Sequence, residues 1–507
     1  MPSTFPPGPA DRTGRFLAGI GADPARADAA RGVHIELVAD RLDPASEIAL
    51  ALTATLLLRM DDYAPTIHMI VPSDRTASLP FLSGAPLPEA LVAAYTGFSS
   101  LDRLSTAPAT ECDLRLVYGG ARNGLTVTTH GWAVSLGEEL AGEGNALAAS
   151  YAGALAASEA LKILLAPLGA TDARARPWRG MVSLWDHSLS GEPGPTIESV
   201  DLGPHAWVGA GGVASAAAWA LAVLPAAGAR LTGTGVVVDH DLIDEDGTNL
   251  NRHLTALFEH RGNAKAVLLA ELLSTAGLRL DPRQVRWAEL AQAERHPDVA
   301  VVSVDDDAVR RAVQLDMPAL IINAGTGDTG EYQTTQHNFI DDACLACISH
   351  ADETVTGPEH ALARRLGLAV EDLQPYVHSR EPLPDALCAQ LALTAQEREQ
   401  VAAIPARSLF EHFCATLHPQ DGPAVSIPML SAAAGVLLAA ELTRHAIDRT
   451  FTPGQVVRTN ILSGPHRRWR STRAKSGGCV CNDAIYQDHY RERWSEGQPT
   501  PLNARRQ

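Results

Sequence analysis

A glycine-rich turn at residues 209–212, Gly-Ala-Gly-Gly, lies between an apolar run that starts at His205 and a long stretch of small residues. A strand, a glycine turn and a helix in this order are typical of nucleotide sites. Glycine lets the backbone approach a phosphate group, and the free N–H groups of the first helical turn face the anion. Ordinary tight turns show the same pattern, so the turn alone does not identify a nucleotide site.

Charged residues follow this turn at spacings that suit a triphosphate. Asp239 ends the next apolar run, where a carboxylate can accept a ribose hydroxyl. Asn249 and Arg252 come shortly afterwards, and Lys265 follows Arg252 by 13 residues (265 − 252). Cations at such positions neutralise the charge that builds on phosphate oxygens in a transition state. A hydride-transfer enzyme has no such need, so the set favours a triphosphate substrate.

Three consecutive aspartates, Asp305, Asp306 and Asp307, follow an apolar run and precede a predicted helix. Carboxylates at the C-terminal end of a parallel strand lie at the ligand edge of the sheet, and they are the usual protein ligands of Mg²⁺ on a polyphosphate. Helix N-capping is the alternative, although a cap needs only one of them. The motif G-x-x-x-x-G-K-[ST] does not occur, which argues against a P-loop enzyme.

The seven cysteines include two close pairs, one with C-x-x-C spacing and one with C-x-C spacing. Two such pairs can form a closed tetrathiolate zinc site, and redox activity of one thiol is the alternative. The expected zinc ligands are Cys344, Cys347, Cys479 and Cys481. The remaining cysteines are Cys112, Cys388 and Cys414, and a small buried residue is the default interpretation for each.

Together, G-A-G-G, D-x-D, N-L-x-R and the following Lys resemble the superfamily of adenylating enzymes that includes ThiF, MoeB and the ubiquitin-activating enzymes. The resemblance implies an ATP site with bound Mg²⁺, and it implies zinc at the two cysteine pairs. It also implies an acceptor cysteine in the crossover ahead of the helix at Met429, which favours Cys414, with Cys388 as the second choice. The implied ATP-site residues are Gly209, Gly211, Gly212, Asp239, Asn249, Arg252, Lys265 and Asp305.

The function implied by this resemblance is activation of a ubiquitin-like protein. Its C-terminal carboxylate is adenylated with ATP, carried as a thioester, and passed to a ubiquitin-conjugating-like enzyme. The chain is most similar to the two-lobed ubiquitin-activating enzymes of bacterial ubiquitin-like conjugation operons of the Bil-type antiviral kind. Two alternatives stay open: a sulfur-carrier adenylyltransferase of the thiamine or molybdopterin type, and an NAD-dependent oxidoreductase.

The elements that must position these residues belong to an α/β fold with mostly parallel, Rossmann-like sheets. The resemblance implies a duplication: an inactive adenylation-like domain at 1–170, a linker at 171–200 and an active ThiF-like domain at 201–507, with a cysteine-bearing crossover at about 350–428. We expect a hairpin turn at residues 119–124 between two strands. Strands are expected at 33–38, 65–71, 114–118 and 125–129, and buried helices at 44–59, 145–165 and 429–445.

Composition narrows the function further. The chain has 507 residues, 46% of them hydrophobic and 20% charged, as in a soluble globular protein. A net charge of −18 argues against nucleic acid or an anionic membrane as the main partner. The first residues have no basic region followed by an apolar run, so we expect no signal peptide and a cytoplasmic protein. The implied internal pseudo-dimer is compatible with a monomer. One basic run, at residues 466–475, could instead meet an acidic partner.

Overall fold

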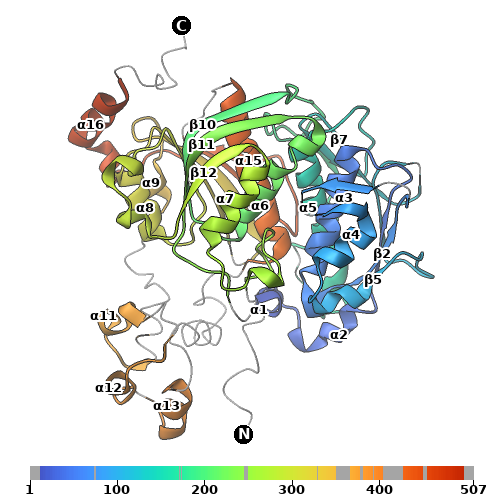
Figure 1. The fold of residues 1–507 in the computed structure, drawn as a ribbon, viewed down its shortest axis with the longest axis horizontal. Helices are drawn as coiled ribbons and strands as arrows, with labels where there is room; N and C mark the ends of the chain where they lie inside the picture. Colours follow the sequence, from blue (N-terminus) through green and yellow to red (C-terminus); the bar gives the residue numbers. More distant parts are fainter. Residues whose placement is uncertain are drawn as a thin grey trace.

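Two β-sheets, each with helices packed on it, form the frame of the protein in a computed structural model (Figure 1). The described residues are 12–73, 76–80, 82–120, 122–170, 172, 174–244, 249–327, 329–349, 363, 366–376, 381–391, 393–402, 426–448 and 454–495. We call the part that carries the first sheet the first half and the part that carries the second sheet the second half. The two sheets have 7 and 8 strands, so the α/β fold class is confirmed.

The first half is built from helices and strands between Arg12 and Ser183, and α3 and α5 are its longest helices. Its sheet has the order β5-β2-β1-β6-β7-β8-β9. Its helices are α1 (Arg12–Gly19), α2 (Ala27–Ala30), α3 (Pro44–Leu58), α4 (Leu87–Ala94) and α5 (Ala146–Leu165). Its strands are β1 (His34–Val38), β2 (Thr66–Ile70), β5 (Leu104–Ser105), β6 (Leu114–Val117), β7 (Leu125–His130), β8 (Ala133–Leu136) and β9 (Gly180–Ser183), with a separate pair β3 (Thr76–Leu79) and β4 (Leu82–Pro86).

The second half has a sheet of the order β12-β11-β10-β13-β14-β15-β16-β17. Its strands are β10 (Ser199–Val208), β11 (Arg230–Val238), β12 (Leu278–Arg283), β13 (Val299–Val302), β14 (Leu320–Thr326), β15 (Glu331–His337), β16 (Gln455–Asn460) and β17 (Arg470–Thr472). Its helices are α6 (Gly212–Ala222), α7 (Lys265–Thr275), α8 (Asp307–Leu315), α9 (Leu345–Ile348), α11 (Val370–Leu373), α12 (Asp385–Cys388), α13 (Ala395–Ala402), α15 (Pro428–Asp448) and α16 (Ala484–Ser495).

The two sheets repeat one strand order and one set of directions. In the first half β2, β1, β6 and β7 are parallel, and β8 and β9 are antiparallel additions. In the second half β11, β10, β13 and β14 are parallel, and β15 and β16 are antiparallel additions. Helix α3 follows β1 as α6 follows β10, and α5 follows β8 as α15 follows β15.

Helices α5 and α15 lie side by side at the centre of the molecule and join the halves, while α3 packs on α5 and α6 packs on α15 (Figure 1). Small residues allow this close packing: a Cβ at Gly153 of α5 would lie 2.6 Å from the Ala49 carbonyl oxygen. A Cβ at Gly435 of α15 would lie 2.6 Å from Ala216 Cβ. By length and composition α5 and α15 could cross a membrane, yet 89% of each apolar window is buried inside the structure.

The hairpin expected at residues 119–124 is wrong, because β6 and β7 pair in parallel with Leu116 opposite Leu125. Because the two strands are parallel, the chain after β6 must run back to the sheet edge at which β6 begins before β7 can start. Gly119 and Gly120 make the bend after β6, with φ of +69° and +147°. In the second half α8 makes the same return between β13 and β14. The residues of a turn do not show by themselves whether the two strands pair as a hairpin or in parallel, since parallel pairing depends on contacts with the neighbouring strands.

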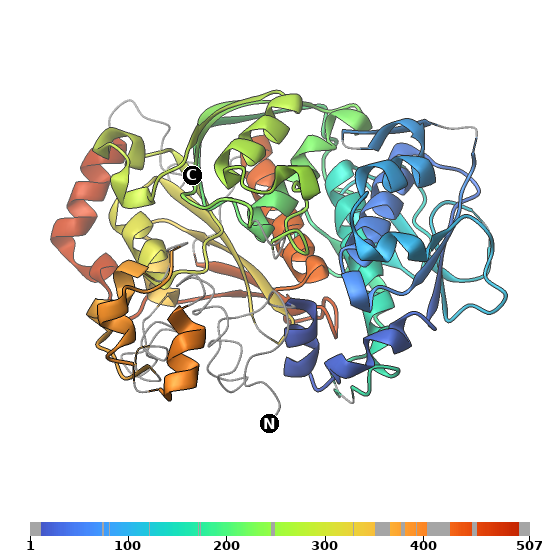
Figure 2. The same ribbon diagram turned by 60° about the horizontal axis from the view of Figure 1, so that its bottom comes forward.

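Strand β9, at Gly180–Ser183, lies inside the stretch 171–200 for which a linker is expected, and it extends the first sheet by pairing with β8. Helices α11, α12 and α13 belong to the expected crossover and enclose a small apolar cluster of their own. Figure 2 shows α1 at the boundary between the two halves, below the second sheet.

Candidate functional site

The glycine turn at 209–212 lies where three parallel strands end. The Gly209 N–H donates to the Val238 carbonyl of β11 at 2.9 Å, and Gly209 has φ of +91°. A Cβ at Gly209 would lie 2.9 Å from Val304 Cγ1, just beyond β13, so only glycine fits between the strand ends. Gly211 precedes α6, and among the described residues, its own chain neighbours aside, no heavy atom lies within 4 Å of the place its Cβ would take. The turn is therefore open above the first turn of α6.

Asp239, at the end of β11, is tied directly to this turn. Its Oδ2 accepts from the Ala210 N–H at 2.6 Å, and its Oδ1 accepts from the Asp241 N–H at 2.8 Å. Burial and the neighbouring Asp241 raise the pKa of Asp239, whereas Lys265 lowers it. Each carboxylate oxygen has a second lone pair, so Asp239 can still accept a ligand hydroxyl.

The 249–256 segment brings Asn249 and Arg252 close to the glycine turn. The Asn249 side-chain amide donates to the Asp244 carboxylate, and both residues are buried. A Cβ at Gly212 would lie 3.1 Å from Arg252 Cγ, so the Arg252 side chain lies against the glycine turn. The segment thus places a guanidinium-bearing side chain beside the N-terminus of α6.

His253 and Leu254 fasten the 249–256 segment to the turn. His253 is fully buried, its Nε2 donates to the Ala210 carbonyl at 2.8 Å, and its Nδ1 accepts from the Thr255 hydroxyl at 3.1 Å. Burial, helped by the positive charge of Lys265, lowers the pKa of His253 to about 3, so the ring is neutral at pH 7. The Leu254 N–H donates to Ser215 Oγ of α6 at 3.0 Å.

Lys265 begins α7 and is 5% exposed. Its Nζ lies 2.8 Å from Asp241 Oδ2, and its backbone N–H donates to the Asp241 carbonyl at 3.0 Å. Asp239, His240 and Asp241 each offer one ligand atom within 4.8 Å of the others, and the Lys265 ammonium group already supplies a positive charge to this cluster. Asp241, two residues after Asp239, therefore holds the Lys265 ammonium group near the carboxyl end of β11.

The three consecutive aspartates lie at the end of β13, in three different environments. Asp306 caps α8, accepting from two N–H groups of its first turn at 2.6 and 3.3 Å. Asp307 pairs with Arg310 at 2.8 Å. Asp305 is exposed and directly follows Val304, which packs against the turn. The capping role thus belongs to Asp306, and Asp305 remains available as a ligand.

The structure brings most of the expected site residues to one sheet edge. Strands β11, β10 and β13 are neighbours, so Asp239, the glycine turn and Asp305 lie next to one another. The N–H groups at the start of α6, Arg252 and Lys265 provide positive charge there, and Asp305 provides a carboxylate. Such an arrangement can hold a polyphosphate and its metal ion at the carboxyl ends of parallel strands.

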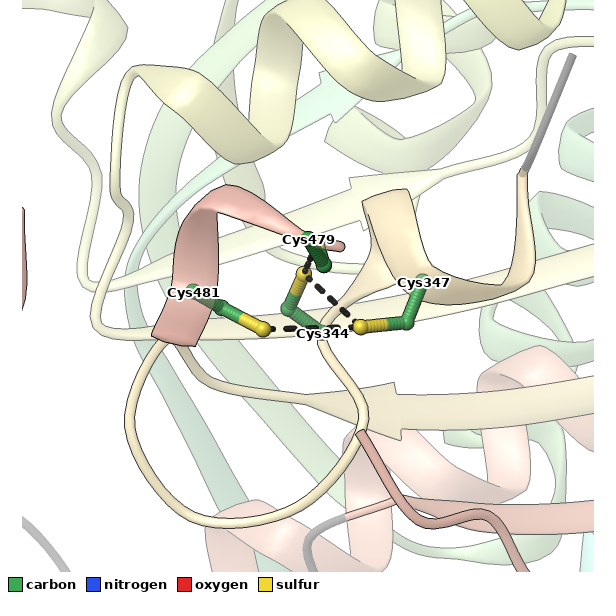
Figure 3. A group of neighbouring side chains, drawn as sticks. All are labelled: Cys344, Cys347, Cys479 and Cys481. Carbon is green, nitrogen blue, oxygen red and sulfur yellow. Dashed lines mark hydrogen bonds between the residues drawn. The ribbon is translucent and has the colours of Figure 1, made fainter. Parts of the chain in front are cut away.

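The four paired cysteines form a cluster where α9 meets the short 3-10 turn Val480–Asn482 that precedes α16 (Figure 3). Their sulfur atoms lie within 4.8 Å of one another: Cys344 is 3.5 Å from Cys479, Cys347 is 3.4 Å from Cys481, and Cys344 is 3.7 Å from Cys347. Four thiolates bound tetrahedrally at about 2.3 Å from zinc would be about 3.8 Å apart. The donor set and its spacing therefore fit a closed zinc site.

The expected acceptor cysteine, Cys414, lies outside the described residues. Cys388, the second choice, is 6% exposed in α12, and burial raises the pKa of its thiol. Its Sγ donates to the Leu383 carbonyl at 3.5 Å. A buried thiol with a raised pKa is a poor nucleophile, so the surroundings of Cys388 favour a packing role.

The residues that hold the 249–256 segment in place are not among those predicted from the sequence. His253 stands directly after Arg252 and could have been found as a buried neighbour of the motif. Two others come from the first half: Arg59 donates to carbonyl groups of the segment, and Thr13 accepts from Asn251 at 2.6 Å. No local pattern marks Arg59 and Thr13, since their contacts join residues about two hundred positions apart.

The basic run at 466–475 lines a hollow of about 250 Å³ beside β16 and β17. Arg458, Arg468 and Arg473 face it, together with His466. Glu331 also lines it, but its carboxylate accepts from Thr329 and Asn460. The hollow therefore concentrates positive charge on a protein whose net charge is −18.

No protein-family model matches the chain, and comparisons with known proteins and solved structures give the following similarities. The uncharacterized protein y4jF of Sinorhizobium fredii is 28% identical over 408 residues, which cover 75% of this chain and 77% of that protein. E. coli MccB with succinimide is 12% identical with a TM-score of 0.32, and the match covers 55% of this chain and 66% of that one, just under two thirds. E. coli MccB with ATP is 11% identical with a TM-score of 0.32, covering 71% and 98%. PaaA is 15% identical with a TM-score of 0.29, covering 54% and 65%.

Proposed function

We propose that the second half is an ATP-dependent adenylating enzyme that activates the C-terminal carboxylate of a ubiquitin-like protein. The observation that carries this proposal is the meeting of the open glycine turn, Arg252, Lys265 and Asp305 at the ends of β10, β11 and β13. A nicotinamide enzyme would use the turn and Asp239 but would leave those three charged side chains without a role.

The first half is proposed to be the inactive partner of an internal pseudo-dimer. The sequence predicts bounds of 1–170 for it, a linker at 171–200 and an active part at 201–507, but β9 at Gly180–Ser183 extends the sheet of the first half into the expected linker. Support comes from the turn after β1, which is the counterpart of the glycine turn. Asp43 caps α3 there, accepting from the Ser46 N–H at 2.8 Å, and Asp40 pairs with Arg122 at 2.6 Å. The carboxylates of Asp40 and Asp43 therefore lie in the turn between β1 and α3, where a bound phosphate would need free N–H groups.

The first chemical step is attack by the carrier carboxylate oxygen on the α-phosphorus of ATP. A new O–P bond forms, the bond to the β-phosphate bridge breaks, and pyrophosphate leaves. Gly209, Gly211 and Gly212 would line the nucleotide, and Asp239 would hold the ribose. Arg252 and Lys265 would stabilise negative charge on the phosphates, with Asn249 beside them.

Two metal ions complete this proposal. Asp305 would hold Mg²⁺, which neutralises charge on the leaving pyrophosphate. Zn²⁺ would occupy the cluster of Cys344, Cys347, Cys479 and Cys481, where it would fix α16 to the body of the second half.

The second proposed step is attack by the Cys414 thiolate on the carbonyl carbon of the acyl-adenylate. A thioester forms and AMP leaves, and a ubiquitin-conjugating-like enzyme then accepts the carrier in the cytoplasm. The arginine-lined hollow beside β17 offers an acidic segment of either partner a place to bind. A bacterial antiviral operon of the Bil type is the setting that the resemblance favours.

If an operon of the expected type surrounds this gene, it encodes a ubiquitin-like protein beside it, and the thioester step can be tested with that protein. We expect a reductant-sensitive adduct on a non-reducing gel with wild-type protein, Mg²⁺ and ATP. Cys414→Ala should abolish the adduct and keep ATP–pyrophosphate exchange, whereas Cys388→Ala should keep both. An adduct that survives in Cys414→Ala would overturn the assignment of the nucleophile. Exchange without any adduct would favour a sulfur-carrier adenylyltransferase.

A further inference from the structure

Arg59 of the first half reaches into the second half at the end of α3. It is completely buried. Its Nη1 donates to the Leu250 carbonyl, and its Nη2 donates to the carbonyls of Leu254 at 3.2 Å and Ala256 at 2.9 Å. One guanidinium group therefore binds three carbonyl groups of the 249–256 segment.

The surroundings of Arg59 are built for a fixed guanidinium group. Its central carbon lies 5.2 Å from the centre of the Tyr95 ring and 5.3 Å from that of the Phe98 ring. The Phe98 ring in turn meets the Phe258 ring edge to face at 5.0 Å. Burying a charge is costly unless the group is hydrogen-bonded, and a planar fork with several N–H donors suits an arc of carbonyl groups. Nη1 and Nη2 of Arg59 are bonded in this way, and its buried Nε has no partner among the described residues.

The 249–256 segment is held from two sides. On one side His253 and Leu254 bind the glycine turn and α6. On the other side are Arg59 and Thr13, whose hydroxyl accepts from the Asn251 side chain. Arg252 lies between these anchored residues and Asn249 directly precedes them, so the position of Arg252 depends on contacts from the first half.

We propose that Arg59, assisted by Thr13, is a positioning residue that sets the 249–256 segment, and with it Arg252, against the glycine turn. This inference rests on the proposed function, because it takes the 249–256 segment to be part of the ATP site. The first half would then be required for nucleotide binding although it holds no nucleotide itself. A displacement of about 1 Å at a site of this kind can reduce the rate about a hundredfold.

The test compares Arg59→Lys with Arg103→Lys in the full chain. Arg103 is also buried, and it donates to the carbonyls of Asp62, at 3.0 Å, and Ala64, entirely within the first half. Hydrogen exchange at residues 250–256 reports the positioning, calorimetry with Mg·ATP reports the affinity, and urea unfolding reports the stability. Thr13→Val is the milder variant, because it removes the hydroxyl that accepts from Asn251 without changing side-chain volume.

We expect Arg59→Lys to speed exchange at 250–256 and to weaken Mg·ATP binding at least tenfold. Thr13→Val should act in the same direction, and Arg103→Lys should lower stability without either effect. Unchanged exchange at 250–256 in Arg59→Lys, or in Thr13→Val if Arg59→Lys does not fold, would overturn the inference. Equal effects of Arg59→Lys and Arg103→Lys would also overturn it. Faster exchange in a protein whose wild type binds no Mg·ATP would support the positioning role and refute the proposed function.

Discussion

Asp305, Asp306 and Asp307 are chemically identical, yet each has its own environment at the end of β13. Asp306 caps α8 and Asp307 pairs with Arg310, while Asp305 is exposed beside the glycine turn. Residue identity alone predicts a carboxylate cluster, and only the folded chain separates the cap from the candidate ligand.

This separation gives a prediction with a control inside the same triplet. Asp305→Ala should weaken Mg²⁺-dependent ATP binding at least tenfold, about 1.4 kcal/mol, because a metal ligand is lost. Asp306→Ala should leave that affinity unchanged and lower the free energy of unfolding by about 1 kcal/mol, because a helix cap is lost. Calorimetry and urea unfolding measure the two quantities. The reverse pattern would show that Asp306, not Asp305, binds the metal.

Glu441 of α15 is a buried carboxylate, and we expect its charge to make the free energy of unfolding depend on pH in the acid range. Its oxygens lie 2.6 Å from His187 Nε2 and 2.5 Å from Arg444 Nη2. Burial would raise the pKa of Glu441, but Arg444 and His187 lower it from 4.5 to about 2. A lowered pKa means that this stabilisation is complete above pH 4.5 and is lost as the pH falls towards 2.

The expected loss over this pH range is on the order of 3 kcal/mol of unfolding free energy. Glu441→Gln should be less stable at pH 7 and should lose less stability between pH 5 and pH 2. Glu159 of α5 is the control, because burial raises its pKa although Lys162 lies 2.5 Å away. Glu159→Gln should therefore not reduce the loss on acidification. Urea unfolding across pH decides this, and equal acid slopes in wild type and Glu441→Gln would contradict the prediction.

At the scale of elements, α5 and α15 occupy equivalent places in the two sheets. Each carries a buried glutamate with a basic partner three residues later: Glu159 with Lys162, and Glu441 with Arg444. The sequence shows two similar helices rich in small residues. Their equivalence becomes clear only from the repeated strand order of the sheets.

Helix α16 depends on both packing and the cysteine cluster. Tyr490 Oη donates to the Ala319 carbonyl at 2.6 Å, and Trp494 Nε1 donates to the Met317 carbonyl at 3.0 Å. A structural zinc ion contributes roughly 10–16 kcal/mol of binding free energy at neutral pH in small metal-dependent domains. Zinc would therefore strengthen the attachment of α16, to which the hydrogen bonds of Tyr490 and Trp494 already contribute.

We predict one tightly held zinc ion per chain, measured by elemental analysis of the purified protein. Cys481→Ser should release the metal and speed hydrogen exchange in α16, whereas Cys388→Ser should do neither. A stable protein that contains no zinc after expression with the metal would refute the site.

For the whole molecule, the sequence predicts the strand, glycine turn and helix of the site, the buried helices and the cysteine cluster. These features depend on local pattern and residue type. The parallel pairing of β6 with β7 and the contact of Arg59 with Leu250 depend instead on how distant segments meet. No spacing in the sequence encodes such contacts, so the role of the first half in shaping the site had to come from the structure.

The central claim is that the second half binds ATP with Mg²⁺, and titration calorimetry on the full chain tests it most directly. We predict Mg²⁺-dependent binding of ATP at one site per chain and no comparable binding of NAD⁺. Lys265→Met should weaken ATP binding about a hundredfold, about 2.7 kcal/mol. Lys162→Met, which breaks a buried ion pair of the first half, should leave ATP affinity unchanged. Tight NAD⁺ binding without ATP binding would contradict the account.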